Sequence, residues 1–206
     1  IGGMGVLVFV MVIVSLEEKN SMHLMRAEVP GPETDKLVPK ARSSAKILYG
    51  MYFVLTLIEV ILLHFGGMNL FDSLIHSFST AGTGGFSNYA ASVGHFESAY
   101  IDGVISTFMI LFGINFNLYY LLLLKEFKPV FKNEELRTYL GIIGIAPLMI
   151  TMNISGQYES IGEAFRYAIF QISAIITTTG FATADYCLWP MLSQCVLLML
   201  MVCGAC

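Results

Sequence analysis

The sequence predicts an all-α membrane protein built from a repeated unit, in which a span is followed by a short re-entrant helix, a glycine-bearing loop and a second span. Three observations favour this fold class. Hydrophobic residues make up 56% of the 206 residues and charged residues 13%, whereas about a quarter of the residues in soluble domains are charged. Basic residues gather in two stretches of the chain, and one pattern of small and polar residues occurs twice.

Five apolar segments are the predicted spans, and two shorter ones are the predicted re-entrant helices. A helix needs roughly 20 apolar residues to cross a bilayer, so a segment that is shorter or more polar is expected to enter and return. The predicted spans are residues 5–16, 47–66, 103–124, 139–152 and 191–206. The predicted re-entrant helices are residues 70–81 and 161–176. Because the first and last spans are cut short, we expect the chain to be a fragment of a longer protein.

Positive charge predicts the orientation of these spans. Between the first and second spans lie Lys19, Arg26, Lys36, Lys40, Arg42 and Lys46, and between the third and fourth lie Lys125, Lys128, Lys132 and Arg137. The outer connections hold only Arg166. Since loops rich in Lys and Arg stay in the cytoplasm, both basic loops are predicted to be cytoplasmic. The two basic loops would lie on the same side of the membrane even if each short segment crossed it fully. The charge pattern alone therefore does not establish that the short segments are re-entrant.

An internal repeat joins the two predicted re-entrant helices. The stretch LFDSLIHSFSTAGTGGFSNYAAS aligns with FRYAIFQISAIITTTGFATADYC. The alignment pairs three residues of one copy with three of the other: Thr83 with Thr178, Gly85 with Gly180 and Phe86 with Phe181. Each copy is thus a short apolar helix followed by Thr-x-Gly-Phe and a small polar tail.

The repeated loop has the composition of an ion filter. Irregular backbone at membrane depth is tolerated only where protein covers it or a water-filled cavity adjoins it. Backbone carbonyls can replace the hydration shell of a monovalent cation, as in potassium channels, and glycine permits the backbone angles that turn carbonyls toward one axis. Threonine adds a hydroxyl oxygen, and the following Phe can brace the loop from behind. The repeated units are therefore expected to resemble those of potassium channels.

Acidic residues dominate the predicted outer segments, which carry Asp72, Glu97, Asp102, Glu159, Glu163 and Asp185. A negative vestibule would concentrate cations at the pore mouth, although acids that merely solubilise the outer loops are an equal alternative. Neither filter stretch contains a carboxylate, which disfavours a site for divalent cations.

Further stretches carry a resemblance to a known family. MRAEVPGPETDKLVPKARSSAKILY resembles the first cytoplasmic connection of the Trk/Ktr/HKT superfamily of potassium uptake proteins, most closely of the TrkH type. FGINFNLYYLLL and NEELRTYL are similar to the inner helix of its second repeat and the loop that follows. Together with the two filter-like loops, the resemblance covers essentially the whole chain. It implies four repeats arranged around one pore.

On that pattern the chain holds parts of three repeats. Residues 1–16 would be the end of the inner helix of repeat 1, 17–46 a cytoplasmic loop, 47–124 repeat 2, 125–138 a second cytoplasmic loop, and 139–206 repeat 3 without its C-terminal end. Two of four filter strands would then be present, so this chain alone would not conduct.

The resemblance also assigns site residues. The ion-binding filter residues are Thr83, Gly84, Gly85 and Phe86 in one copy, and Thr178, Thr179, Gly180 and Phe181 in the other. In the family, glycine before the Phe is associated with potassium preference, and both copies have it. Gly82 and Gly84 make the first loop unusually flexible, which leaves the strictness of selection open. Gly204 is expected to mark the start of an intramembrane gate, with plain helix packing an equal alternative.

The expected function is potassium transport by the pore-forming subunit of a Trk-type uptake system in a bacterial-type plasma (inner) membrane, with the filter loops facing outside. Sodium transport or sodium/potassium cotransport by the same fold is the alternative, and a Ser in place of a filter glycine would favour it. An intramembrane hydrolase is a remote alternative, because the sequence has no G-x-S-x-G, no H-E-x-x-H and no paired intramembrane aspartates. We expect no enzyme activity and no cofactor, with potassium as the substrate.

The resemblance implies three partners: the lipid membrane, a second copy that completes a homodimer, and a cytoplasmic nucleotide-binding regulatory subunit of the TrkA type. Nucleic acid is not expected as a partner, since the net charge is -4. Whether transport is channel-like or coupled to another ion is left open.

Several polar residues have open roles. Glu59 lies inside a span, where an acid is by default a functional candidate, and a structural role is an equal alternative. Arg166 is expected to anchor its helix or form a local ion pair. Asn115 and Asn117 are expected to hydrogen-bond to another helix, or else to face the pore.

The histidines and cysteines are not expected to bind metal. His23, His64, His76 and His95 show no ligand spacing and are expected to have ordinary packing roles. Cys203 and Cys206 form a C-x-x-C in an apolar helix, where small-residue packing is favoured over redox chemistry.

Overall fold

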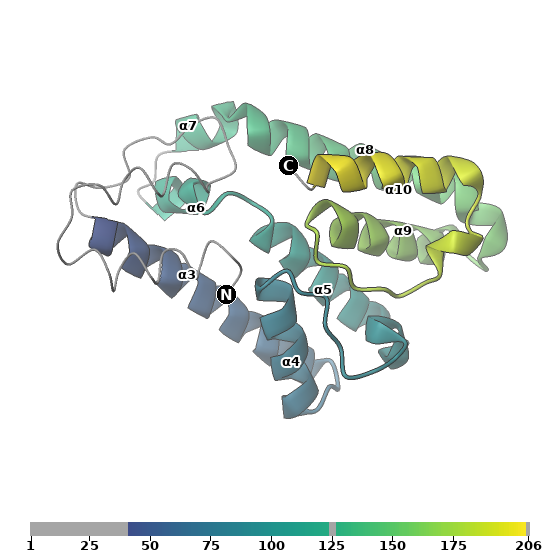
Figure 1. The fold of residues 1–206 in the computed structure, drawn as a ribbon, viewed down its shortest axis with the longest axis horizontal. Helices are drawn as coiled ribbons and strands as arrows, with labels where there is room; N and C mark the ends of the chain where they lie inside the picture. The colour runs from purple at the N-terminus through teal and green to yellow at the C-terminus, as the bar shows by residue number, and fades with distance from the viewer. Residues whose placement is uncertain (1–40, 124–126, 205–206) are drawn as a thin grey trace.

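A computed structural model describes residues 41–123 and 127–204, and every regular element within them is a helix (Figure 1). The predicted all-α class is therefore confirmed. The first predicted span, residues 5–16, and most of the first basic loop lie outside the described residues.

The first half of the described chain holds five helical elements: α3 (Ala41–Phe65), α4 (Leu70–Ala81), η1 (Ser92–Phe96), α5 (Ala99–Phe112) and α6 (Phe116–Leu123). The turn from α3 into α4 uses Gly67 at φ 98°, a left-handed conformation that glycine adopts without steric cost. Asn69 then caps α4, because its side-chain oxygen accepts the N–H of Asp72 at 2.8 Å. The helix over residues 70–81 forms as predicted.

The predicted span 103–124 is divided, because α5 ends at Phe112 and α6 begins at Phe116. Gly113 closes α5, and its N–H donates to the Met109 carbonyl at 3.0 Å. A Cβ on Gly113 would lie 2.5 Å from the hydroxyl oxygen of Tyr139. That hydroxyl donates to the carbonyl of Ile110 at 3.1 Å. A contact of α8 with α5 thus lies at the point where α5 stops.

The second half contains α7 (Phe127–Lys132), α8 (Glu134–Ile154), η2 (Ser155–Gln157), α9 (Ile161–Ile176), η3 (Tyr186–Leu188) and α10 (Met191–Gly204). Asn133 caps α8 by accepting the N–H of Leu136 at 2.9 Å, so α8 begins before its apolar run. The expected loop 125–138 is consequently helical over much of its length. Ser160 caps α9 in the same way, accepting the N–H of Glu163 at 3.1 Å.

Two helical stretches are long and apolar enough to cross a membrane, Ile47–Phe65 and Glu134–Gln157, and α5 and α10 are shorter apolar helices. Large apolar side chains on one face of α3 are exposed, among them Phe53, Leu57 and Ile61. Apolar faces of this kind suit a lipid environment, as the predicted membrane fold requires.

The two halves pack together through α5 and α9. In Figure 1, α5 lies between α4 and α9, and α8 and α10 lie on the other side of α9. One hydrophobic cluster joins Ile105 and Met109 of α5 to Phe170 and Ala174 of α9. A second cluster lies among α8, α9 and α10. The short helix α4 thus packs on α3 and α5, α9 packs on α5, α8 and α10, and the loops that follow the two short helices lie close together.

Candidate cation filter

The loops after α4 and α9 have the same backbone conformation at corresponding residues. Thr83 and Gly85 have φ values of 50° and 63°, and Thr178 and Gly180 have values of 56° and 84°. A non-glycine residue with positive φ is uncommon, yet both threonines adopt it. Successive carbonyls point to opposite sides of an ordinary strand, and a left-handed residue at every second position breaks that alternation. Both loops thus have the local geometry that a row of carbonyls facing one side requires.

Hydrogen bonds at the ends of the two helices also correspond. Gly82 donates to the Phe78 carbonyl at 2.9 Å, and its counterpart Thr177 donates to the Ser173 carbonyl at 3.2 Å. The next residues repeat the agreement: Thr83 donates to Thr80 and Thr178 to Ile175, each at 3.0 Å. The helix ends therefore place the first threonine of each filter loop in equivalent positions.

The loops differ one residue later. In the predicted repeat 2, the N–H of Gly84 donates to the Ser79 carbonyl at 2.7 Å, whereas in the predicted repeat 3 the N–H of Gly180 donates to the Ala174 carbonyl at 3.1 Å. The Ser79 hydroxyl also accepts the N–H of Phe86 at 2.5 Å. These bonds restrain the glycine-rich loop of repeat 2, which the sequence alone predicts to be unusually flexible.

The threonine side chains of repeat 3 have different environments. Thr178 is exposed, whereas Thr179 is buried. The Thr179 hydroxyl is 2.8 Å from the Thr177 hydroxyl, which donates to the Ser173 carbonyl at 2.6 Å. The Thr179 hydroxyl is thus bonded within its own loop, and its backbone carbonyl is the oxygen that faces repeat 2.

The two filter loops touch through their backbones at Gly85. A Cβ added to Gly85 would collide with the Thr179 carbonyl oxygen and would lie 2.9 Å from the carbonyl carbon of Gly180. A Cβ added to Gly180 would meet no atom within 4 Å. The structure therefore brings the two predicted filter strands side by side, with glycine required at the contact.

The phenylalanines that follow the filter glycines have unlike surroundings. Phe181 is 1% exposed and lies in the cluster that joins the repeats, with its ring stacked on His76 at a centroid distance of 5.8 Å. Phe86 is 77% exposed within the described chain. The expected bracing position behind the loop is therefore occupied by Phe181.

Buried polar residues on α4 and α9 hold the segments that follow the filter. His76 is fully buried, with Nδ1 2.8 Å from the Asp72 carbonyl and Nε2 3.0 Å from the Ser87 hydroxyl. Gln171 occupies the aligned position in α9, and its amide donates to the Ala184 carbonyl at 3.4 Å. His76 therefore has a packing role, and its two ring nitrogens in addition bond α4 itself and the segment that follows it. The alignment could have revealed the role, since it pairs a histidine with a glutamine inside two apolar helices.

Asp72 is an anchor for the repeat 2 loop and not a vestibule charge. It is 2% exposed, and its carboxylate accepts hydrogen bonds from the amide of Asn69 at 2.8 Å, the amide of Asn88 at 2.6 Å and the hydroxyl of Tyr89 at 2.9 Å. The bond to Asp72 raises the pKa of Tyr89 above its ordinary value. Of the expected vestibule acids, Glu97, Glu159 and Asp185 are exposed.

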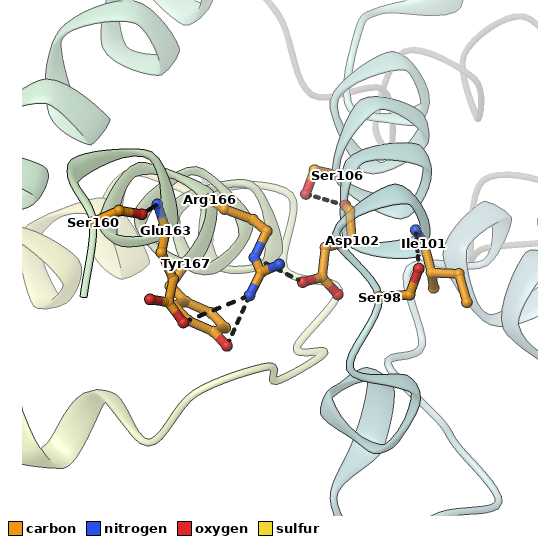
Figure 2. A network of polar contacts seen from close by, with 8 residues as sticks. All are labelled: Ser98, Ile101, Asp102, Ser106, Ser160, Glu163, Arg166 and Tyr167. Atoms are coloured by element: carbon orange, nitrogen blue, oxygen red, sulfur yellow. Dashed lines mark hydrogen bonds and ion pairs between the residues drawn. The ribbon is translucent and has the colours of Figure 1, made fainter. Parts of the chain in front are cut away.

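Asp102 is also buried, because it pairs with Arg166 across the two repeats (Figure 2). Arg166 Nε lies 3.4 Å from the Asp102 carboxylate. The guanidinium also lies 4.7 Å from the centre of the Tyr167 ring, donates to the Tyr167 hydroxyl at 2.9 Å, and is 4.0 Å from Glu163. Arg166 therefore forms the expected local ion pair, and the pair connects α5 of repeat 2 to α9 of repeat 3.

Gly204 lies against the end of α9, just before the predicted filter residues that begin at Thr178. A Cβ on this glycine would be 2.6 Å from the Ile176 carbonyl oxygen and 3.0 Å from that of Ile175. The end of α10 thus approaches the last turn of α9 closely. Cys203 is exposed, and Cys206 lies outside the described residues.

Of the two asparagines expected in the inner helix, the structure describes the side chain of Asn115 but not that of Asn117. Asn115 lies in the break between α5 and α6, where its carbonyl accepts the N–H of Leu118 at 2.9 Å. Within residues 41–123 and 127–204, no three His, Cys, Asp or Glu side chains gather as a metal site.

The whole chain, residues 1–206, matches the model of a protein family described as TrkH, cation transport protein. It is 35% identical over 209 residues to the Trk system potassium uptake protein TrkH of Salmonella typhimurium, which covers 100% of this chain and 43% of that protein. It is 36% identical over 196 residues to the TrkH protein of Halomonas elongata, covering 92% of this chain and 40% of that protein.

A solved structure has the same fold. The crystal structure of the potassium transporter TrkH from Vibrio parahaemolyticus superposes with a TM-score of 0.78 at 29% identity, over 96% of this chain and 40% of that chain. The chain therefore spans less than half the length of these relatives.

Proposed function

Since the chain belongs to the TrkH family of cation transport proteins, we propose that it supplies two of the filter strands of a potassium-transporting pore. The observation that carries the proposal is the pair of Thr-x-Gly loops with matching left-handed residues, which meet at Gly85 and Thr179. The family is one of transport proteins, not of enzymes, and its description names no cofactor. Potassium is the substrate named for the related uptake proteins.

Selection in such a pore rests on neutral oxygens. The carbonyls of residues 83–85 and 178–180 would replace part of the hydration shell of a potassium ion. A carboxylate in the filter would instead favour divalent cations, and neither loop has one. Phe181 supports the repeat 3 loop from behind through its contact with His76. Two strands supply part of the coordination shell, and the remaining strands belong to the rest of the full-length protein.

The setting of the pore is part of the same proposal. Residues 47–124 and 139–206 are two successive pore repeats, the basic loops face the cytoplasm, and the filter loops face outward. The repeat boundaries are supported by the corresponding bonds of α4 and α9. Gly204 begins an intramembrane gate beneath the filter, supported by its position against Ile175 and Ile176. The full-length protein forms a homodimer that binds a cytoplasmic nucleotide-binding subunit of the TrkA type.

The decisive experiment measures rubidium uptake by the full-length protein in cells that lack their own potassium uptake. The native protein is compared with Gly180→Ser at matched membrane expression. We expect potassium to compete with rubidium in the native protein, and the substitution to abolish uptake or admit sodium. Gly144→Ala is the matched control, because a Cβ at this exposed position of α8 meets nothing within 4 Å.

Uptake that Gly180→Ser leaves unchanged would show that the loop is not the selective element. Sodium uptake by the native protein without potassium competition would favour the alternative of sodium transport.

A further inference from the structure

Glu59 lies in the second half of α3 with no exposed surface. Neither of its carboxyl oxygens has a hydrogen-bond partner among the described residues, and the hydroxyl of buried Ser77 on α4 also lacks one. The carboxyl group lies beside Thr80 of α4. The arrangement of the carboxyl group and the Thr80 side chain is not that of a formed hydrogen bond. Unpaired buried polar groups are costly, so three such atoms on two helices that pack together call for an explanation.

The corresponding helices of the predicted repeat 3, α8 and α9, share an apolar cluster. There α8 presents Ile150 and Ile154 to the apolar face of α9. In the filter alignment the α4 residues and their α9 counterparts are Ser73 with Ala168, Ser77 with Ile172, and Thr80 with Ile175. At these three positions α4 is therefore polar where α9 is apolar, and the helix packed on α4 carries the buried acid Glu59. An isolated buried acid would not require polar residues opposite it, whereas a hydrogen-bonded cluster would.

The hydrogen atoms available decide the form of the cluster. The Thr80 hydroxyl donates its one hydrogen to the His76 carbonyl at 2.8 Å, so toward Glu59 it can only accept. A carboxylate has no hydrogen to donate, but a carboxylic acid has one. Ser77 and Thr80 are three residues apart and share a face of α4. Within the described residues, Glu59 forms no ion pair that would compensate a buried charge.

We propose that Glu59 is a neutral carboxylic acid whose O–H donates to the Thr80 hydroxyl and whose carbonyl oxygen accepts from Ser77. The group thereby positions the last turn of α4. That turn starts the filter, since the Thr80 carbonyl accepts the N–H of Thr83 at 3.0 Å. Glu59 is a positioning residue for ion selection, and this role rests on the proposed function.

The test compares Glu59→Gln with Glu59→Leu in the full-length protein. Glutamine carries a donor group and a carbonyl acceptor in the same places as the neutral acid, with one N–H more than the acid has O–H, whereas leucine carries neither. We expect Glu59→Gln to keep the native ratio of rubidium to sodium uptake. Glu59→Leu should lower that ratio roughly three- to tenfold, the effect of one or two interhelical hydrogen bonds. Both variants should reach the membrane in native amounts, since leucine suits a span.

A third variant separates positioning from packing. Glu59→Leu combined with Ser77→Ile and Thr80→Ile gives repeat 2 the apolar interface of repeat 3. We expect it to be at least as thermostable as Glu59→Leu while the uptake ratio stays low. Recovery of the native ratio in this variant would reduce the role of Glu59 to packing and overturn the proposal.

A readout independent of transport completes the design. Infrared spectra of the purified protein at neutral pH should contain the carbonyl band of a protonated, hydrogen-bonded carboxylic acid that Glu59→Gln removes. Absence of that band would mean that Glu59 is charged and would overturn the proposal. A Glu59→Gln variant as defective as Glu59→Leu would mean that a neutral donor and acceptor do not replace Glu59, and would also overturn it. Failure of rubidium uptake in the native protein would instead contradict the proposed function, and the infrared result would still decide the state of Glu59.

Discussion

Gly85 of repeat 2 packs its bare backbone against the carbonyl group of Thr179 in repeat 3. Gly180, which occupies the aligned position, faces open space within the described chain. Two glycines that are equivalent in sequence are thus under different constraints. Gly85 needs both a left-handed backbone and the absence of a side chain, while Gly180 needs only the first.

Alanine should therefore be tolerated unequally at these two glycines. A left-handed backbone costs an L-residue about 1–2 kcal/mol, and Gly85→Ala adds the collision with Thr179. We expect Gly85→Ala to lower rubidium uptake by more than about tenfold, since tenfold corresponds to roughly 1.4 kcal/mol. Gly180→Ala should lower it by less. Uptake is measured at matched membrane expression, with Gly144→Ala as control, and equal losses at both glycines would contradict the described contact.

Histidine and glutamine should be interchangeable at position 76, whose side chain bonds the segment that follows the filter loop. His76→Gln places in α4 the residue that α9 carries at Gln171, so a donor and an acceptor remain. We expect this variant to retain most of the uptake and selectivity. His76→Leu should lose two hydrogen bonds, each worth about 1 kcal/mol, and should unfold at a lower temperature with weaker selection. If His76→Gln were as defective as His76→Leu, the hydrogen bond between His76 and the Ser87 hydroxyl would not be the contact that supports uptake and selectivity.

The ion pair between Asp102 and Arg166 should couple the two repeats. A double-mutant cycle with Asp102→Asn, Arg166→Gln and the double variant measures this coupling through thermal unfolding of the purified full-length protein. Neighbouring residues in one polar network typically show interaction energies of about 0.5–3 kcal/mol, and we expect a value in that range. Glu163→Gln serves as the comparison, because Glu163 lies 4.0 Å from Arg166 within the same helix. Additive effects of the two substitutions would show that the pair does not hold the repeats together.

Gly204 should accept no larger side chain. A Cβ there would lie 2.6 Å from the Ile176 carbonyl, so Gly204→Val must move α10 away from the end of α9. We expect a loss of thermal stability of about 1–3 kcal/mol, the usual effect of overpacking, together with reduced uptake. Cys203→Val is the neighbouring control at an exposed site. A stable Gly204→Val protein with altered flux would favour the gate over simple packing.

The repeat and its two short helices could be predicted from the sequence because they rest on local signals. Capping residues bound α4 and α9, and the Thr-x-Gly-Phe pattern marks both loops. The break in the helix after Phe112 could not be predicted from the sequence, because it depends on a tertiary contact. Tyr139 of α8 lies against Gly113 at the break. The burial of Asp102 likewise depends on Arg166, far along the chain. Composition predicts acids in the outer segments, but tertiary contacts decide which of them face water.

The unlike settings of Phe86 and Phe181 show that successive repeats meet through different surfaces. Repeat 3 inserts Phe181 against His76 of repeat 2, while Phe86 of repeat 2 leaves its own ring uncovered in the described chain. A head-to-tail contact of this kind either closes into a ring or continues as an open helix, according to the rotation between neighbours. The rotation here is set where α5 packs on α9. The packing of these two helices, together with the contacts of Gly85 and Phe181, therefore fixes how the two halves of the described chain are rotated relative to each other.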